Sequence, residues 1–178
     1  WIKREILLDI QGRRRKRQME LAEKFGLDDY PTPSGGCLLT DPGFSSRLRK
    51  LLNWRGWLKK EDIWLLKVGR HFFAENYWIV IGRNEGENRL LQQWALPEDV
   101  RLTTVSRKGP LVIVRFTKER LTEAVKEAAL LAVRYSQARR DEKAIVCWES
   151  QGIREELLIP RQEWEKYLTS EEKSFSPT

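Results

Sequence analysis

The hydrophobic pattern changes its period near residue 61, and this change limits the fold more than any other feature of the chain. Beyond it, apolar side chains come in short runs rich in β-branched and aromatic residues, which predict strands. Six such runs occur: "IWLLKVGRHFF" (63–73), "YWIVIGRN" (77–84), "VRLTTVS" (100–106), "LVIVRF" (111–116), "AIVCWE" (144–149) and "REELLI" (154–159). The chain is therefore expected to build a sheet from six strands.

A long helix is predicted between the fourth and fifth runs, in "TKERLTEAVKEAALLAVRYSQARR" (117–140). Thr117 suits the N-cap, and the apolar stripe that should face the sheet consists of Leu121, Val125, Ala128, Ala132 and Tyr135. We expect an α+β fold: an N-terminal basic helical segment (1–60), then a mostly antiparallel sheet with one long packed helix (61–168), and a flexible tail (169–178).

Two helices are predicted within the first 60 residues. One runs from Arg13 to Phe25 and ends before Gly26, which suits a left-handed C-cap. The other is "FSSRLRKLLNW" (44–54), with Phe44, Leu48, Leu51 and Leu52 on one side. A loop rich in Pro and Gly (30–43) separates the two helices and carries Cys37.

Positive charge is concentrated in the first third of the chain. The formal net charge is +7, and residues 1–60 hold 14 Lys and Arg against 7 Asp and Glu, which accounts for all of it. Five consecutive cations, Arg13, Arg14, Arg15, Lys16 and Arg17, begin the first helix and oppose its dipole, which favours negative charge there. This conflict favours a polyanionic partner such as nucleic acid, and the alternative is a solvated surface.

The two cysteines, Cys37 and Cys147, have no metal-ligand spacing, and no metal site is expected. Cys37 follows Gly35 and Gly36, so it is either a small residue under a tight turn or an accessible thiol. Cys147 lies within a strand and should be buried. Unpaired cysteines indicate a reducing, cytoplasmic compartment, and no apolar run is long enough to cross a membrane. Because the chain begins at Trp1, we expect an upstream part to be missing.

Two predicted strands end in Gly-Arg followed by a polar residue, as Arg70-His71 and Arg83-Asn84, with Asn88 close behind. A guanidinium next to glycine suits close contact with phosphate, although hairpin turns use the same residues. The eight tryptophans suit either a core or a stacking platform for single-stranded nucleic acid. No nucleotide-binding or hydrolase motif is present, so no cofactor is expected in this chain.

The segment around Cys37 resembles PP-loop tRNA thiouridylases, which insert sulfur into tRNA uridine. "SGGCLLTDPGFSSRLRKLL" is similar to the turn and helix around the family's sulfur-carrying cysteine, although Gly36 and Leu38 differ from the family's flanking residues. The resemblance implies that Cys37 is catalytic as a sulfur carrier. It also implies ATP as the cofactor of a PP-loop domain that this chain lacks, so the chain would be an incomplete enzyme.

A second resemblance, over about residues 64–160, is to the NFACT-R domain. It rests on "YWIVIGRNEGENRLL", then "LTEAVKEAALLAVRYSQAR", then a strand pair. It implies RNA binding, with tRNA or another structured RNA as partner. The residues expected to contact RNA are Arg13, Arg14, Arg15, Lys16, Arg17, Arg70, His71, Arg83, Asn84, Asn88 and Arg139. The alternative is a protein-interaction module that docks on its PP-loop domain or on a ribosomal protein without touching RNA.

Overall fold

The structure, a computed structural model, describes residues 16–27, 38–117 and 122–171. It divides the chain into two compact units, Trp1–Cys37 and Leu38–Thr178. In the first unit, α1 (Lys16–Lys24) is largely exposed. The sequence places the start of this helix at Arg13, which lies outside the described residues. The boundary expected after residue 60 falls inside the second unit.

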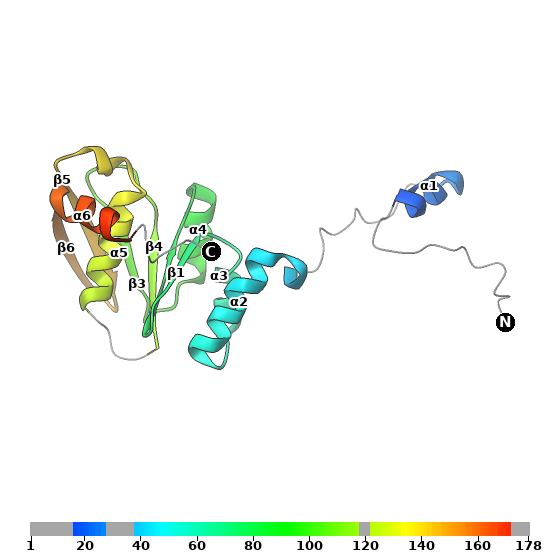
Figure 1. The fold of residues 1–178 in the computed structure, drawn as a ribbon, viewed down its shortest axis with the longest axis horizontal. Helices are drawn as coiled ribbons and strands as arrows, with labels where there is room; N and C mark the ends of the chain where they lie inside the picture. Colours follow the sequence, from blue (N-terminus) through cyan, green and yellow to red (C-terminus); the bar gives the residue numbers. More distant parts are fainter. Residues whose placement is uncertain (1–15, 28–37, 118–121, 172–178) are drawn as a thin grey trace. The chain divides into compact units, whose positions relative to one another are not determined.

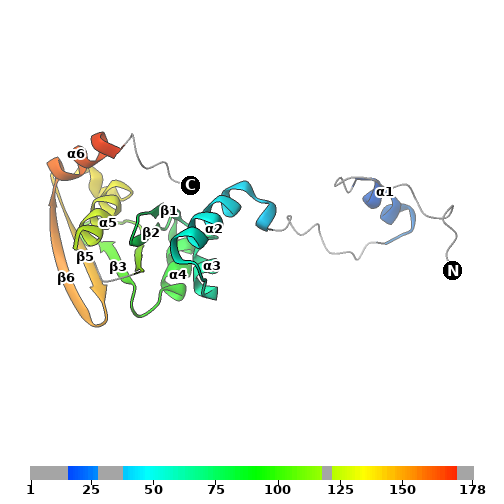
Figure 2. The same ribbon diagram turned by 60° about the horizontal axis from the view of Figure 1, so that its bottom comes forward.

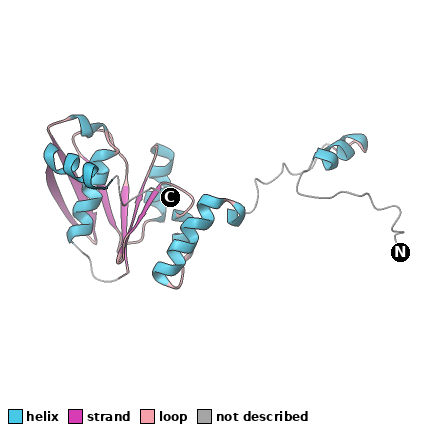
Figure 3. Ribbon diagram, in the orientation of Figure 1, coloured by secondary structure: helices cyan, strands magenta, loops and turns pink. Residues whose placement is uncertain are grey.

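A six-stranded antiparallel sheet forms the centre of the second unit (Figures 1 and 3). Its strand order is β1-β2-β4-β3-β5-β6. The strands are β1 (Arg70–Phe73), β2 (Tyr77–Ile81), β3 (Val100–Thr104), β4 (Val112–Phe116), β5 (Lys143–Ser150) and β6 (Ile153–Pro160). The predicted α+β class is therefore confirmed.

Helices cover both faces of this sheet. One group consists of α2 (Pro42–Arg55), α3 (Lys60–Leu65) and α4 (Glu85–Trp94), which lie beside β1 and β2 in Figure 2. The other consists of α5 (Thr122–Arg134) and α6 (Arg161–Glu171). Two 3₁₀ helices, η2 (Leu38–Thr40) and η3 (Gln137–Arg140), precede α2 and follow α5.

Alternation along the strands supplies two separate cores. In β2, Ile79 and Ile81 join the core under α5, whereas Trp78 and Val80 join the core under α2, α3 and α4. From α2, Leu51 is fully buried in the second core. The sequence analysis placed α2 in the basic N-terminal segment. In the structure α2 packs on the sheet, because its apolar side is buried against the face that carries Trp78 and Val80.

A buried ionic network joins α2 and α3 to the sheet. Arg115 of β4 donates from Nε and Nη2 to Asp99 at 2.9 and 2.6 Å, and from Nη1 to Asp62 of α3 at 2.6 Å. Arg55 of α2 also donates to Asp62, at 3.1 Å. Arg115, Asp62 and Asp99 are at most 1% exposed, so every charge in this network is compensated by a direct partner.

The structure corrects several details of the sequence prediction. The run 63–73 is not one strand, because its first part belongs to α3 and only Arg70–Phe73 is β1. The sequence missed α4 and α6, and residues 169–171 of the expected tail belong to α6. Leu52 is 42% exposed rather than buried with Leu51. Thr117, which the sequence suggests as the N-cap of the long helix, donates its hydroxyl to the carbonyl oxygen of Asn76, and α5 begins at Thr122. Within the described ranges, no helix has both the length and the apolar character needed to cross a membrane.

Candidate nucleic-acid interface

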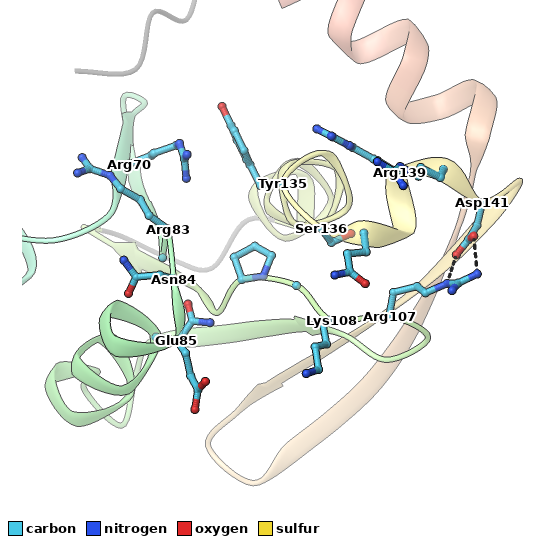
Figure 4. Close-up of a pocket in the computed structure, with 16 residues that line it drawn as sticks. Arg70, Arg83, Asn84, Glu85, Arg107, Lys108, Tyr135, Ser136, Arg139 and Asp141 are labelled. Atoms are coloured by element: carbon cyan, nitrogen blue, oxygen red, sulfur yellow. Dashed lines mark hydrogen bonds and ion pairs between the residues drawn. The ribbon is translucent and has the colours of Figure 1, made fainter.

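One open pocket of about 1280 Å³ lies where four segments of the second unit meet (Figure 4). The start of β1, the β2–α4 junction, the β3–β4 loop and the region after α5 supply its walls. Its lining residues are Arg70, Gly82, Arg83, Asn84, Glu85, Asn88, Arg107, Lys108, Gly109, Pro110, Tyr135, Ser136, Gln137, Arg139, Arg140 and Asp141. Six of these are cations and two are carboxylates, so the lining is strongly basic.

Gly82, at the end of β2, allows α4 to lie close to the sheet. A Cβ atom at this position would lie 2.0 Å from the Asn88 side-chain oxygen. That oxygen accepts a hydrogen bond from the backbone N–H of Leu111 at 3.0 Å, which joins α4 to the start of β4. Asn84 is the N-cap of α4, and its side-chain oxygen accepts from the N–H of Glu87 at 2.9 Å. Both asparagines therefore shape the pocket as well as lining it.

The guanidinium of Arg83 is held by backbone. Its Nη2 donates to the carbonyl oxygen of Gly69 at 2.7 Å. The Glu87 carboxylate instead accepts backbone N–H groups, from Gly69 at 3.1 Å and from Arg83 at 2.8 Å. Arg83 thus keeps a fixed position at the pocket wall while most of its N–H donors stay available.

Tyr135 follows the last residue of α5 and lies between the two sides of the pocket (Figure 4). The Arg70 guanidinium lies 4.6 Å from the centre of the Tyr135 ring, and that of Arg134 lies 5.4 Å from it. These are distances at which a cation is attracted to an aromatic face. The Tyr135 ring, which follows α5, therefore orients the side chain of Arg70, which belongs to β1.

A cap after α5 positions the opposite wall. The Ser136 hydroxyl accepts from the N–H of Ala138 at 3.0 Å and donates to the carbonyl oxygen of Val133 at 2.8 Å. Ala138 is fully buried in the core under α5, and this anchors η3. The N–H of Gln137 donates to the carbonyl oxygen of Lys108 at 3.0 Å, which ties η3 to the β3–β4 loop.

The cations of this wall differ in how they are paired. Arg107 makes two hydrogen bonds to Asp141, of 3.1 and 3.2 Å, drawn as dashed lines in Figure 4. Arg139 and Arg140 are exposed, and no carboxylate among the described residues pairs with either. Two guanidinium groups are thus open to an anion, and a third is held by a carboxylate.

The structure brings together five of the residues that the sequence predicts for RNA contact: Arg70, Arg83, Asn84, Asn88 and Arg139. Lys16 and Arg17 lie on α1 in the first unit. The remaining cations of that cluster, Arg13, Arg14 and Arg15, and also Cys37, lie outside the described residues. Their proposed roles stay predictions.

His71 is placed differently from Arg70, its neighbour in β1. It is 2% exposed, and its Nδ1 accepts a hydrogen bond from Trp78 Nε1 at 3.2 Å. Burial, reinforced by the charges of Arg47 and Arg83, lowers the pKa of His71 to about 3. The imidazole is therefore neutral near pH 7 and does not line the pocket.

Sequence reasoning missed Arg107, Lys108 and Arg140 and assigned Tyr135 only to the core. The "SRKGP" stretch (106–110) carried a usable signal, because a Lys-Gly turn between two strands places its cations at a sheet end. That this end coincides with the end of α5 depends on the strand order, which no local pattern reveals.

A family model described as the NFACT protein RNA binding domain matches residues 69–167, which include every lining residue of the pocket. The chain belongs to this family. The NFACT-R resemblance expected from the sequence is thereby confirmed, and the match covers more than half of the chain. No curated protein matches the chain.

Among solved structures, the chain is similar to the C-terminal part of the fibronectin/fibrinogen-binding protein from Streptococcus suis. The two are 18% identical with a TM-score of 0.47, and the alignment covers 70% of this chain. This NFACT-R chain matches only 60% of the length of that solved chain.

Proposed function

We propose that the second unit binds RNA through the basic pocket, with its cations holding backbone phosphates. The observation that carries this proposal is the convergence of six cations from four separate segments onto one open surface inside the matched NFACT-R region. Arginine forks suit phosphate oxygens, and phosphate contacts supply much of the affinity of RNA-binding proteins.

The size of the pocket favours a polymer over a small ligand. Small-molecule sites usually have about 300–1000 Å³ and a mostly apolar lining. This pocket has about 1280 Å³, and its polar lining is dominated by Arg and Lys. Cations on both sides suit a chain of phosphates that crosses the pocket.

The alternative, a protein-interaction module, is less compatible with this surface. The core of a protein interface is depleted of charge and rich in apolar contacts. Here the exposed groups include Arg139 and Arg140, neither of which pairs with a described carboxylate. A ribosomal protein or a PP-loop domain would have to supply an acidic surface that matches these positive charges.

The test is binding of the full chain to labelled tRNA and to a single-stranded RNA of mixed sequence, over about 50–200 mM salt. Phosphate contacts make log K fall with log salt, with a slope of about 0.7 per contact on single strands. The double variant Arg139→Gln/Arg140→Gln should bind at least tenfold more weakly and with a shallower slope. The matched control, Lys126→Gln/Lys143→Gln, removes two exposed cations that do not line the pocket.

Equal losses in the pocket variant and in the control would mean that only overall charge matters, and the proposal would fail. Binding that does not depend on salt would favour the protein-partner alternative. Preference for tRNA over the single strand would support the narrower part of the proposal.

That narrower part is that the RNA is tRNA and that the chain acts in the cytoplasm beside a PP-loop domain that uses ATP. The tRNA and the PP-loop domain are inferred from the sequence around Cys37, and the cytoplasmic location from the use of the two cysteines. Its test is a Cys37→Ser change in the parent protein, which should abolish tRNA thiolation. Unchanged thiolation, together with a Cys37 pKa near the free-thiol value of about 8.5, would remove the sulfur-carrier role.

A further inference from the structure

Two arginines that are far apart in the sequence are anchored on one short stretch of backbone between α3 and β1. Arg47 of α2 donates from Nε to the carbonyl oxygen of Leu66 at 3.1 Å. Arg83 donates from Nη2 to the carbonyl oxygen of Gly69 at 2.7 Å. Both carbonyls belong to the connection 66–69, so the two guanidinium groups are anchored on the same four-residue segment.

Neither guanidinium forms an ion pair with a carboxylate among the described residues. Asp41, the acid nearest to Arg47 along α2, caps that helix by accepting from the N–H of Phe44. Glu87 accepts backbone N–H groups rather than the Arg83 guanidinium. Asp41 offsets part of the charge of Arg47 without an ion pair, so N–H donors of both guanidinium groups remain for an anion.

The pKa values of neighbouring groups agree with this arrangement. Burial lowers the pKa of Arg47, and the charge of Arg83 lowers it further, against an opposing effect of Asp41. The charges of Arg47 and Arg83 both add to burial in lowering the pKa of His71. Like charges that lie close together are repulsive in the free protein, and an anion between them removes that cost.

Each anchored guanidinium remains able to bind an anion. Arginine has five N–H donors, and a single bond to a backbone carbonyl leaves the others unused. The anchor also restricts the side chain, so less conformational entropy is lost when an anion binds. Arg83 already lines the pocket, so an anion at this pair would be continuous with RNA bound there.

We propose that Arg47 and Arg83 form a phosphate-binding subsite that extends the RNA-binding surface from the pocket onto α2. Arg47 lies outside residues 69–167, the segment that matches the family model. The RNA track of this chain is therefore longer than its NFACT-R domain. This inference rests on the proposed RNA-binding function.

The test compares RNA binding by the wild-type chain, by Arg47→Gln and by a control on the same helix, Arg49→Gln. Arg49 is exposed and does not line the pocket. Arg47→Gln should weaken binding about tenfold, the size of one charged contact, and should lower the salt slope by about 0.7. Arg49→Gln should bind within twofold of the wild type. Thermal unfolding of each variant checks that the fold persists.

The outcomes separate this inference from the proposed function. If Arg47→Gln binds like the wild type while Arg139→Gln/Arg140→Gln loses affinity, the subsite is wrong and the pocket stands. Equal losses for Arg47→Gln and Arg49→Gln would also overturn the subsite. If the wild type binds no RNA, both proposals fail.

A second measurement needs no variant and remains decisive if Arg47→Gln is unstable. The chain has one histidine, so its imidazole nitrogen resonances are unique. Because His71 lies within the field of Arg47 and Arg83, a phosphate between them should shift these resonances when RNA is added. Resonances that do not move at saturating RNA would overturn the subsite.

Discussion

The guanidinium of Arg70 lies 4.6 Å from the centre of the Tyr135 ring, and this contact joins the first strand to the end of α5. Arg70 is the first residue of β1, and Tyr135 follows the last residue of α5. The pocket lies between elements that are 65 residues apart in the sequence, and this pair spans it. The orientation of its cations is therefore a property of the tertiary fold.

Replacing Tyr135 by Leu should lower RNA affinity about threefold, because a cation–π contact at an exposed site is worth about 0.5–1 kcal/mol and Arg70 would lose its orientation. Tyr135→Phe keeps the aromatic face and should bind like the wild type. Fluorescence anisotropy with one RNA at one salt concentration measures both. Equal affinities for the Leu and Phe variants would show that the ring does not orient Arg70 for binding.

Replacing Asp141 by Asn should strengthen RNA binding and steepen the salt dependence by about 0.7–0.9. The reason is that Asp141 occupies Arg107 with two hydrogen bonds, and its carboxylate repels phosphate. Stability should change by less than about 1 kcal/mol, since the pair is partly exposed. Glu156→Gln, which removes an exposed carboxylate of β6, is the control and should leave affinity unchanged. Weaker binding by Asp141→Asn would contradict this role.

Replacing Asp99 by Ala should destabilise the fold by about 3–5 kcal/mol, because Arg115 would stay buried without its main partner. The N–H of Leu96 would also lose its acceptor. Glu98→Ala, one residue away, removes an exposed carboxylate that pairs with Lys59 at the surface and should cost less than about 1 kcal/mol. Urea unfolding curves measure both. A similar small loss in the two variants would show that the network contributes little.

The stability of the chain should fall in acid because of His71. Its pKa is about 3 in the folded state and 6.5 when unperturbed, so between these values the unfolded chain binds a proton that the folded chain does not. Stability that is present above pH 6.5 is therefore lost on going down towards pH 3, by about 1.4 kcal/mol per pH unit.

The variant His71→Gln cannot titrate and still offers an oxygen to Trp78 Nε1. The free energy of unfolding of the wild type should fall more steeply with acid than that of this variant. Parallel pH profiles for the two proteins would mean that His71 does not have the lowered pKa.

The strands of the sheet could be predicted because each one forms a short apolar run within a few consecutive residues. Successive side chains of such a run point to opposite faces of the sheet. Ile79 and Ile81 face one core and Trp78 and Val80 the other, and a buried strand of this kind is visible as a continuous apolar run. The same reasoning failed at 63–73, where an apolar run does not distinguish a short helix from a strand. There the Asp62 carboxylate accepts the backbone N–H of Lys59 at 2.8 Å, at the start of α3.

The pocket could be predicted only in part. Arg83 was found because it follows a strand end, where side chains commonly meet a ligand, and Arg139 because it belongs to the segment that resembles NFACT-R. Arg107 and Asp141 could not be paired, because their contact depends on how the β3–β4 loop meets the segment after α5. Arg115 reads as an ordinary outward-facing residue of a strand, and its burial follows from helices that pack over that face.

Photo-cross-linking of a 4-thiouridine-containing RNA to the full chain, followed by peptide mapping, tests the central claim most directly. The pocket account predicts cross-links in the segments 82–89, 106–110 and 135–141, and their loss at high salt. Cross-links confined to residues 1–37 or to β6, with none in those three segments, would contradict it.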